Sequence, residues 1–229
     1  MKNLVKRLLK INGARRYISD GMSVSEFLKE LHVKKVNYVV LRWYESLPEV
    51  APEEDIDILV ADEDVSKFEP LLKGRKDWHQ PVDLYSVSGL RGSAYRGLPY
   101  YQPEIAKGIL DRSVIWSGIC RVPCPRDAFL SMAYHVAYHK GHSSGVPVSR
   151  YEGSSNEGHS DHDYVSILLE KARNAGILLE LDDINLANLD KLLDEAGWRP
   201  SIETRTKLSV RNLWLSESLS IDRDDLIKR

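Results

Sequence analysis

Residues 55–60 read Asp-Ile-Asp-Ile-Leu-Val, two acids that alternate with aliphatic residues before the run becomes wholly apolar. A period of two is typical of a β-strand, in which successive side chains point to opposite faces of a sheet. Asp55 and Asp57 are therefore expected to project from one face, while Ile56 and Ile58 turn into the core. Because two carboxylates on one face repel each other, this strand predicts a site that holds a cation.

Two further segments predict strands around it. Tyr38-Val-Val-Leu41 is β-branched and aromatic, and residues 81–87 read Pro-Val-Asp-Leu-Tyr-Ser-Val, with Asp83 in the same kind of alternation. If the strands of Asp57 and Asp83 are neighbours, three carboxylates surround one open face. Such hard oxygen donors suit Mg²⁺ and leave room for phosphate oxygens.

These residues resemble the nucleotidyltransferase superfamily of the DNA polymerase beta type, through Asp55-Ile-Asp57-Ile-Leu-Val and the later Val82-Asp83-Leu. The resemblance covers residues 36–90. It implies that Asp55 and Asp57 bind the metal ions, Mg²⁺ or Mn²⁺, that hold a nucleoside triphosphate. It also implies that Asp83 shares a metal and helps to deprotonate the acceptor hydroxyl, so that a nucleoside monophosphate is transferred and pyrophosphate released.

The chain departs from the family where a Gly-Ser pair usually precedes the aspartates. Here the strand ends in Leu-Arg-Trp-Tyr-Glu, residues 41–45. An arginine makes bidentate contacts to phosphate, so Arg42 is expected to replace the missing amide donors. Gly92-Ser93 follows the third aspartate, and we interpret it as a turn.

Residues 91–150 carry a net charge of +5 and supply further candidates for nucleotide binding. Arg91 and Lys140 are the first candidates for triphosphate contacts. His135, His139 and His142 follow at spacings of four and three, which leaves three interpretations open. They are packed core and helix-end residues, or contacts to a nucleotide (His139 foremost), or the zinc ligands of a metal hydrolase.

The predicted fold class is α/β (α+β), with a small mixed-sheet nucleotidyltransferase-like domain at residues 1–120 and a helical domain at 121–229. Ser23-Val-Ser-Glu26 has the spacing of a capping box at the start of a helix. A Gly-, Ser- and His-rich stretch predicts a long loop at 141–162, and the charged residues 216–229 predict a linker or a docking segment. Helices are expected at residues 4–11, 23–32, 64–72, 125–140, 164–175, 188–196 and 203–215.

The composition narrows the remaining options. The 229 residues carry a formal net charge of −2, which gives no global field for nucleic acid or an anionic membrane. No apolar run approaches the roughly 20 residues of a membrane span, so the expected location is cytoplasmic. Cys120 and Cys124 are expected to be ordinary thiols. A small-molecule acceptor such as a sugar or polyol phosphate is favoured over long nucleic acid, and the oligomeric state stays open. The rival hypotheses are a catalytically silent nucleotide- or protein-binding module and a structural scaffold.

Overall fold

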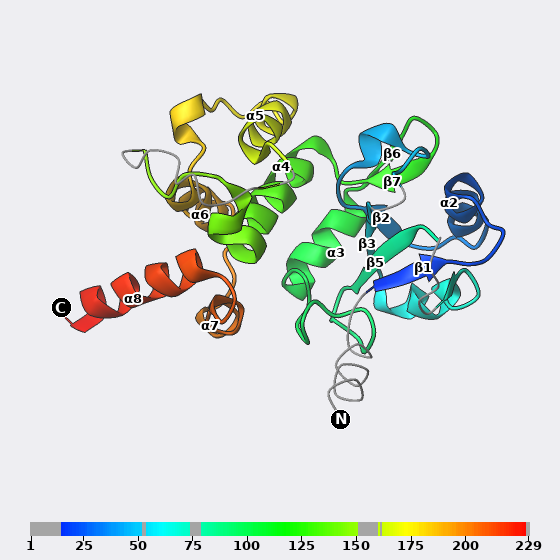
Figure 1. The fold of residues 1–229 in the computed structure, drawn as a ribbon, viewed down its shortest axis with the longest axis horizontal. Coiled ribbons are helices and arrows are strands. Elements are labelled where there is room, and N and C mark those ends of the chain that lie inside the picture. The colour runs from blue at the N-terminus through cyan, green and yellow to red at the C-terminus, as the bar shows by residue number, and fades with distance from the viewer. Residues whose placement is uncertain (1–14, 52–53, 74–78, 151–159, 161, 228–229) are drawn as a thin grey trace. The chain divides into compact units, whose positions relative to one another are not determined.

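The computed structural model describes residues 15–51, 54–73, 79–150, 160 and 162–227. The predicted helix at 4–11 lies outside these ranges. The chain divides into two compact units between Cys124 and Pro125, close to the expected boundary at residue 120. The first unit is built on a sheet and the second on helices, which confirms the α+β class (Figure 1).

The first unit contains a five-stranded mixed sheet in the order β2-β3-β5-β1-β4. β3 and β5 are parallel, and the other neighbouring strands are antiparallel. The three segments predicted as strands, at residues 38–41, 55–60 and 81–87, all form strands of this sheet. The strands are β1 (Arg15–Ile18), β2 (Tyr38–Val40), β3 (Ile56–Val60), β4 (Leu72–Lys73) and β5 (Pro81–Ser86).

Helices cover both faces of this sheet (Figure 1). Helix α2 (Val24–Val33) buries Phe27, Leu28 and Leu31 in a cluster with the aliphatic side chains of β3. It begins with the predicted capping box, in which the amide of Ser23 donates to the Glu26 carboxylate at 2.8 Å. Helix α3 (Pro103–Asp111) contacts β2 and β3 from the other side. A hairpin of β6 (Val114–Trp116) and β7 (Cys120–Val122) lies next to β2.

The prediction of a helix at residues 64–72 is wrong. A 3-10 segment occupies Asp62–Phe68, and the chain then turns into β4. Pro70 explains why no helix continues to residue 72, because proline lacks an amide hydrogen and its ring clashes with a continuing helix. The buried carboxylate of Asp64 holds the 3-10 segment to the sheet by accepting a hydrogen bond of 2.6 Å from the amide of Asn37.

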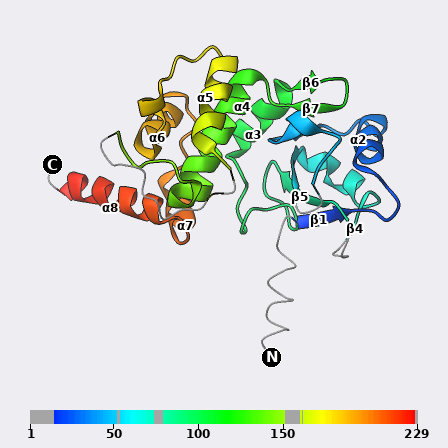
Figure 2. The same cartoon turned by 45° about the horizontal axis from the view of Figure 1, so that its top comes forward.

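The second unit is helical in its described residues, with α4 packed against α5 and α6 (Figure 2). The helix predicted at 125–140 keeps α-helical geometry only to Tyr134 and continues as a π-helical stretch over His135–Lys140. A short 3-10 turn, Gly141–Ser144, begins the predicted loop, whose residues 151–159 and 161 lie outside the described ranges. The helices are α4 (Pro125–Tyr134), α5 (Tyr164–Asn174), α6 (Leu186–Glu195), α7 (Ile202–Ser209) and α8 (Leu213–Ile227).

The predictions of α5 and α6 are confirmed, but the single helix predicted at 203–215 is two helices. Asn212 separates them, because its side chain accepts a hydrogen bond from the amide of Leu215 at 3.1 Å and donates to the carbonyl of Ala137 at 2.9 Å. Residues 216–227 of the predicted linker or docking segment lie in α8. None of the helices in the described part of the chain has the length and apolar composition of a membrane span.

Candidate carboxylate site

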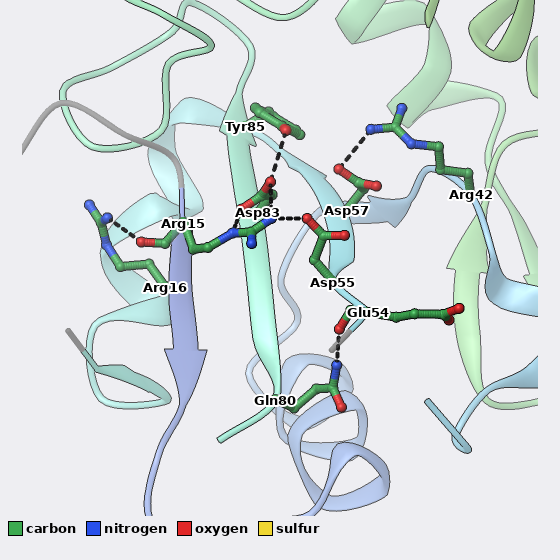
Figure 3. Close-up of polar contacts among 9 residues, drawn as sticks. All are labelled: Arg15, Arg16, Arg42, Glu54, Asp55, Asp57, Gln80, Asp83 and Tyr85. Carbon is green, nitrogen blue, oxygen red and sulfur yellow. Dashed lines mark hydrogen bonds and ion pairs between the residues drawn. The ribbon is translucent and has the colours of Figure 1, made fainter. Parts of the chain in front are cut away.

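The pairing of β3 with β5 brings the three predicted aspartates to one place in the first unit. In this parallel register Asp57 lies opposite Asp83, and Asp55 precedes β3 by one residue. The two strands are thus neighbours, as the prediction of a shared site required. Because alternate residues of a strand share a face, all three carboxylates lie on the same side of the sheet (Figure 3).

An arginine that the sequence analysis missed joins two of these carboxylates. β1 pairs antiparallel with β5 and places Arg15 opposite Asp83. Its Nε donates to Oδ1 of Asp83 at 2.8 Å and its Nη2 to Oδ2 at 3.0 Å. The same Nη2 also pairs with Oδ2 of Asp55, so one guanidinium bridges both side chains (Figure 3).

The charges of this trio depend on one another. Hydrogen bonding to Asp83, together with the charges of Asp83 and Asp55, raises the pKa of Arg15 although partial burial opposes this. The pKa of Asp55 is raised by burial and by the negative charge of Asp83, while Arg15 opposes the rise. The two carboxylates therefore repel each other and are stabilised by the Arg15 guanidinium between them.

The third carboxylate is held by a different arginine. Leu41 extends the β2–β3 pairing by donating its amide to the carbonyl of Asp57 at 2.9 Å, which brings Arg42 next to the Asp57 side chain. Nη2 of Arg42 lies 2.7 Å from Oδ1 of Asp57, and the two side chains are only 7% and 6% exposed. Arg42 also donates to the hydroxyl of Tyr100 at 3.0 Å, and its guanidinium carbon lies 5.3 Å from the centre of that ring.

This pair corrects the expectation that Arg42 contacts phosphate, because its guanidinium is buried in contacts with the protein's own side chains. Burial raises the pKa of Asp57 to about 6, and the charge of Arg42 limits the rise. Burial by itself would lower the pKa of Arg42, but the charge of Asp57 and the surrounding tyrosines together outweigh it, and the pKa is raised well above its usual value. Arg42 therefore stays charged and neutralises Asp57.

Arg91 is not brought to the carboxylates. It is exposed, and with Leu84 and Phe68 it lines a cavity of about 270 Å³. Leu84 follows Asp83 in β5, so it points to the opposite face of the sheet. Gly92 has a φ of 83°, in agreement with the turn predicted there.

His139 and Lys140 belong to the second unit, where His139 is buried and Lys140 is exposed. The rings of His135 and His139 lie 6.2 Å apart, and Nε2 of His135 is 3.3 Å from the hydroxyl of Tyr164. His142 instead pairs with Glu217 at 2.9 Å. The π-helical stretch changes the spacing that an α-helix would give, so the three imidazoles do not converge.

Nowhere in the described ranges are three or more His, Cys, Asp or Glu side chains arranged as a set that could hold a metal ion. At the carboxylate site the reason is visible, because Arg42 pairs with Asp57 and Arg15 lies between Asp55 and Asp83. The oxygen donors of Asp55 and Asp83 still fit a divalent cation at the position of the Arg15 guanidinium. Two carboxylates, 33% and 18% exposed, are already bridged there by one positive group.

Comparisons of the chain with protein-family models, with curated proteins and with solved structures gave no match. The resemblance of residues 36–90 to nucleotidyltransferases therefore stays a prediction. Its support consists of the three aspartates, their order along the chain and the parallel register that brings them together.

Proposed function

We propose that the first unit binds a nucleoside triphosphate with Mg²⁺ or Mn²⁺ and transfers its nucleoside monophosphate to a small-molecule hydroxyl or phosphate. The observation that carries this proposal is the β3–β5 register, which gathers Asp55, Asp57 and Asp83 on one sheet face. Such convergent carboxylates at the end of a strand are the donor set that polyphosphate chemistry uses.

Asp55 and Asp83 are the residues that would hold the cation. A divalent cation bound there supplies positive charge against the triphosphate and the departing pyrophosphate. Asp57 contributes indirectly, because its ion pair with Arg42 links the end of β2 to β3 and so fixes the position of β3. Its role in this proposal is thus to position the site, rather than the direct metal ligation that the resemblance implies.

The reaction is an in-line displacement. An acceptor oxygen forms a bond to the α-phosphorus as the bond from that phosphorus to the bridging oxygen of the β-phosphate breaks, and pyrophosphate leaves with the electron pair. Where the acceptor is a hydroxyl, its proton passes to Asp83, which is 18% exposed and so reachable from solvent.

The test combines binding and turnover on the full chain. The four nucleoside triphosphates are each added with Mg²⁺, and thermal shift and pyrophosphate release are recorded for the wild type, Asp83→Asn and Lys29→Gln. Lys29 is an exposed residue of α2, on the other face of the sheet, and its variant controls for the change of one charged group. We expect Asp83→Asn to lose both responses and Lys29→Gln to keep them. Equal pyrophosphate release by Asp83→Asn would refute the proposal.

One observation favours a second candidate, a nucleotide-binding module without catalysis. Arg15 and Arg42 together pair with all three aspartates, so each carboxylate has a cationic partner without a metal. In that case a nucleotide would raise the melting temperature with no need for Mg²⁺ and without release of pyrophosphate. The zinc hydrolase hypothesis has no comparable support, because His142 pairs with Glu217, away from the other two imidazoles.

A further inference from the structure

Two arginines pair with the aspartates of the carboxylate site, and they differ in how firmly they are held. Arg42 and Asp57 are 7% and 6% exposed, and Arg42 has Tyr100 as a second partner. Arg15 is 48% exposed, and its partners Asp55 and Asp83 are 33% and 18% exposed. Water therefore reaches Arg15 but not the buried pair of Arg42 and Asp57. Of these two arginines, only Arg15 can exchange its partners for solvent at low cost.

The position of Arg15 is also the position that a divalent cation would need. Its guanidinium makes two hydrogen bonds to Asp83 and pairs with Asp55 through the same Nη2. The oxygens that it occupies are the ones that would have to coordinate a metal bound by both carboxylates. Two cations cannot share this space, because they repel each other and compete for the same lone pairs.

We propose that Arg15 is a displaceable internal cation, which blocks the site until a divalent cation takes its place between Asp55 and Asp83. This inference rests on the proposed function, because it describes how that same site is controlled. Arg15 acts as a positioning residue: it holds the two carboxylates together in the metal-free protein and sets how tightly a cation binds. Arg42 stays in its pair throughout, since both of its partners are buried.

Charge favours this exchange. The three aspartates and two arginines carry a net charge of −1 when all are ionised. Replacing Arg15 by a divalent cation brings the cluster to neutrality, while the half-exposed guanidinium returns to water. The exchange therefore moves the site toward electrostatic balance, and the departing guanidinium regains contacts with water.

The test measures Mn²⁺ binding to the metal-free full chain by electron paramagnetic resonance of the free ion, with no nucleotide present. Arg15→Met removes the charge and the hydrogen bonds but keeps a long side chain, and Lys29→Gln removes one positive charge on the other face of the sheet. We expect Arg15→Met to bind Mn²⁺ about tenfold more tightly than the wild type. Lys29→Gln should leave the affinity unchanged, and adding Asp83→Asn to Arg15→Met should abolish the gain.

Salt separates displacement from long-range attraction. The gain in Arg15→Met should persist in 0.5 M salt, where the charges of separated groups are screened over about 4 Å. A gain that disappears at high salt, or wild-type binding that depends on Asp83 and is unchanged in Arg15→Met, would overturn the blocking role while leaving the metal site intact. Absence of Mn²⁺ binding at millimolar concentration in both the wild type and Arg15→Met would overturn the proposed function together with this inference. Circular dichroism melts of each variant confirm that the protein assayed is folded.

Discussion

Replacing Arg42 by methionine should destabilise the first unit strongly, and more at pH 8 than at pH 5. The variant keeps a long apolar side chain but leaves the Asp57 carboxylate, 6% exposed, without its ion-pair partner. Removing one member of a buried pair costs about 3–5 kcal/mol, because an uncompensated charge stays in the core. We expect a loss in this range at pH 8.

The pH dependence follows from Asp57. Its pKa is raised to about 6 in the folded protein, against 3.8 for an ordinary aspartate. This difference corresponds to about 3 kcal/mol. Because the folded pKa lies above the unfolded one, the contribution to stability is fully present below pH 3.8 and is lost as the pH rises through 6. Without Arg42, which lowers this pKa, Asp57 protonates at still higher pH. The carboxyl is then neutral at pH 5, and the loss from Arg42→Met should be much smaller there.

Urea unfolding followed by tryptophan fluorescence measures the free energy of unfolding at pH 5 and at pH 8. The curves are fitted with a separate transition for each unit where two are resolved. Lys73→Met is the control, because Lys73 pairs with Asp20 at 2.9 Å with side chains 48% and 40% exposed. It should cost about 1 kcal/mol or less. Arg42→Met with Asp57→Leu should recover much of the loss, since apolar residues replace buried ion pairs well. The reasoning fails if Arg42→Met costs less than Lys73→Met at pH 8, or if its cost is the same at both pH values.

Three further predictions concern other parts of the chain. Ser23→Ala removes the capping box of α2 and should lower the free energy of unfolding by about 1 kcal/mol in urea, whereas Ser23→Asp should keep most of it. Burial raises the pKa of Cys120 to about 12, so iodoacetamide at pH 8 should modify it far more slowly than the half-buried Cys124; mass spectrometry that finds equal labelling in the folded protein would contradict this. Tyr138→Phe removes a 2.6 Å hydrogen bond from the phenol to Asp190 and should cost about 1–2 kcal/mol in the urea transition of the second unit; an unchanged transition would contradict this contribution.

The central strands could be predicted because their signals are local. An alternation of acids and aliphatic residues over five or six positions marks β3 and β5, and the spacing of Ser23 and Glu26 marks the start of α2. β1 lacks such a local signal, because Arg15–Ile18 has only four residues and two of them are arginines. Its place in the sheet comes from pairing with residues 72–73 and 81–83, far along the chain.

The partners of the aspartates are also set by long-range contacts. Arg15 meets Asp83 across 68 positions of sequence, and Arg42 meets Tyr100 across 58. A sequence pattern can indicate that carboxylates gather and need a cation, but it does not say whether a metal, a substrate or the protein's own arginine supplies it. Arg42 was expected to contact phosphate because it stands where the resembled family has a phosphate-binding Gly-Ser pair. Its burial depends on tyrosines that belong to a distant segment.

The two arginines therefore serve two different properties of the site, its stability and its affinity for a cation. The pair of Arg42 with Asp57 is buried and links the end of β2 to β3, so its loss should appear in stability. The bridge of Arg15 is half-exposed and joins β1 to the carboxylates of β5 and the residue before β3, so its loss should appear in cation affinity. A site in which stability and affinity depend on different residues can exchange its cation without unfolding. Variants at both positions should accordingly give non-additive effects on stability, because the charges of Asp55 and Asp83 act on Asp57 across the β3–β5 pairing.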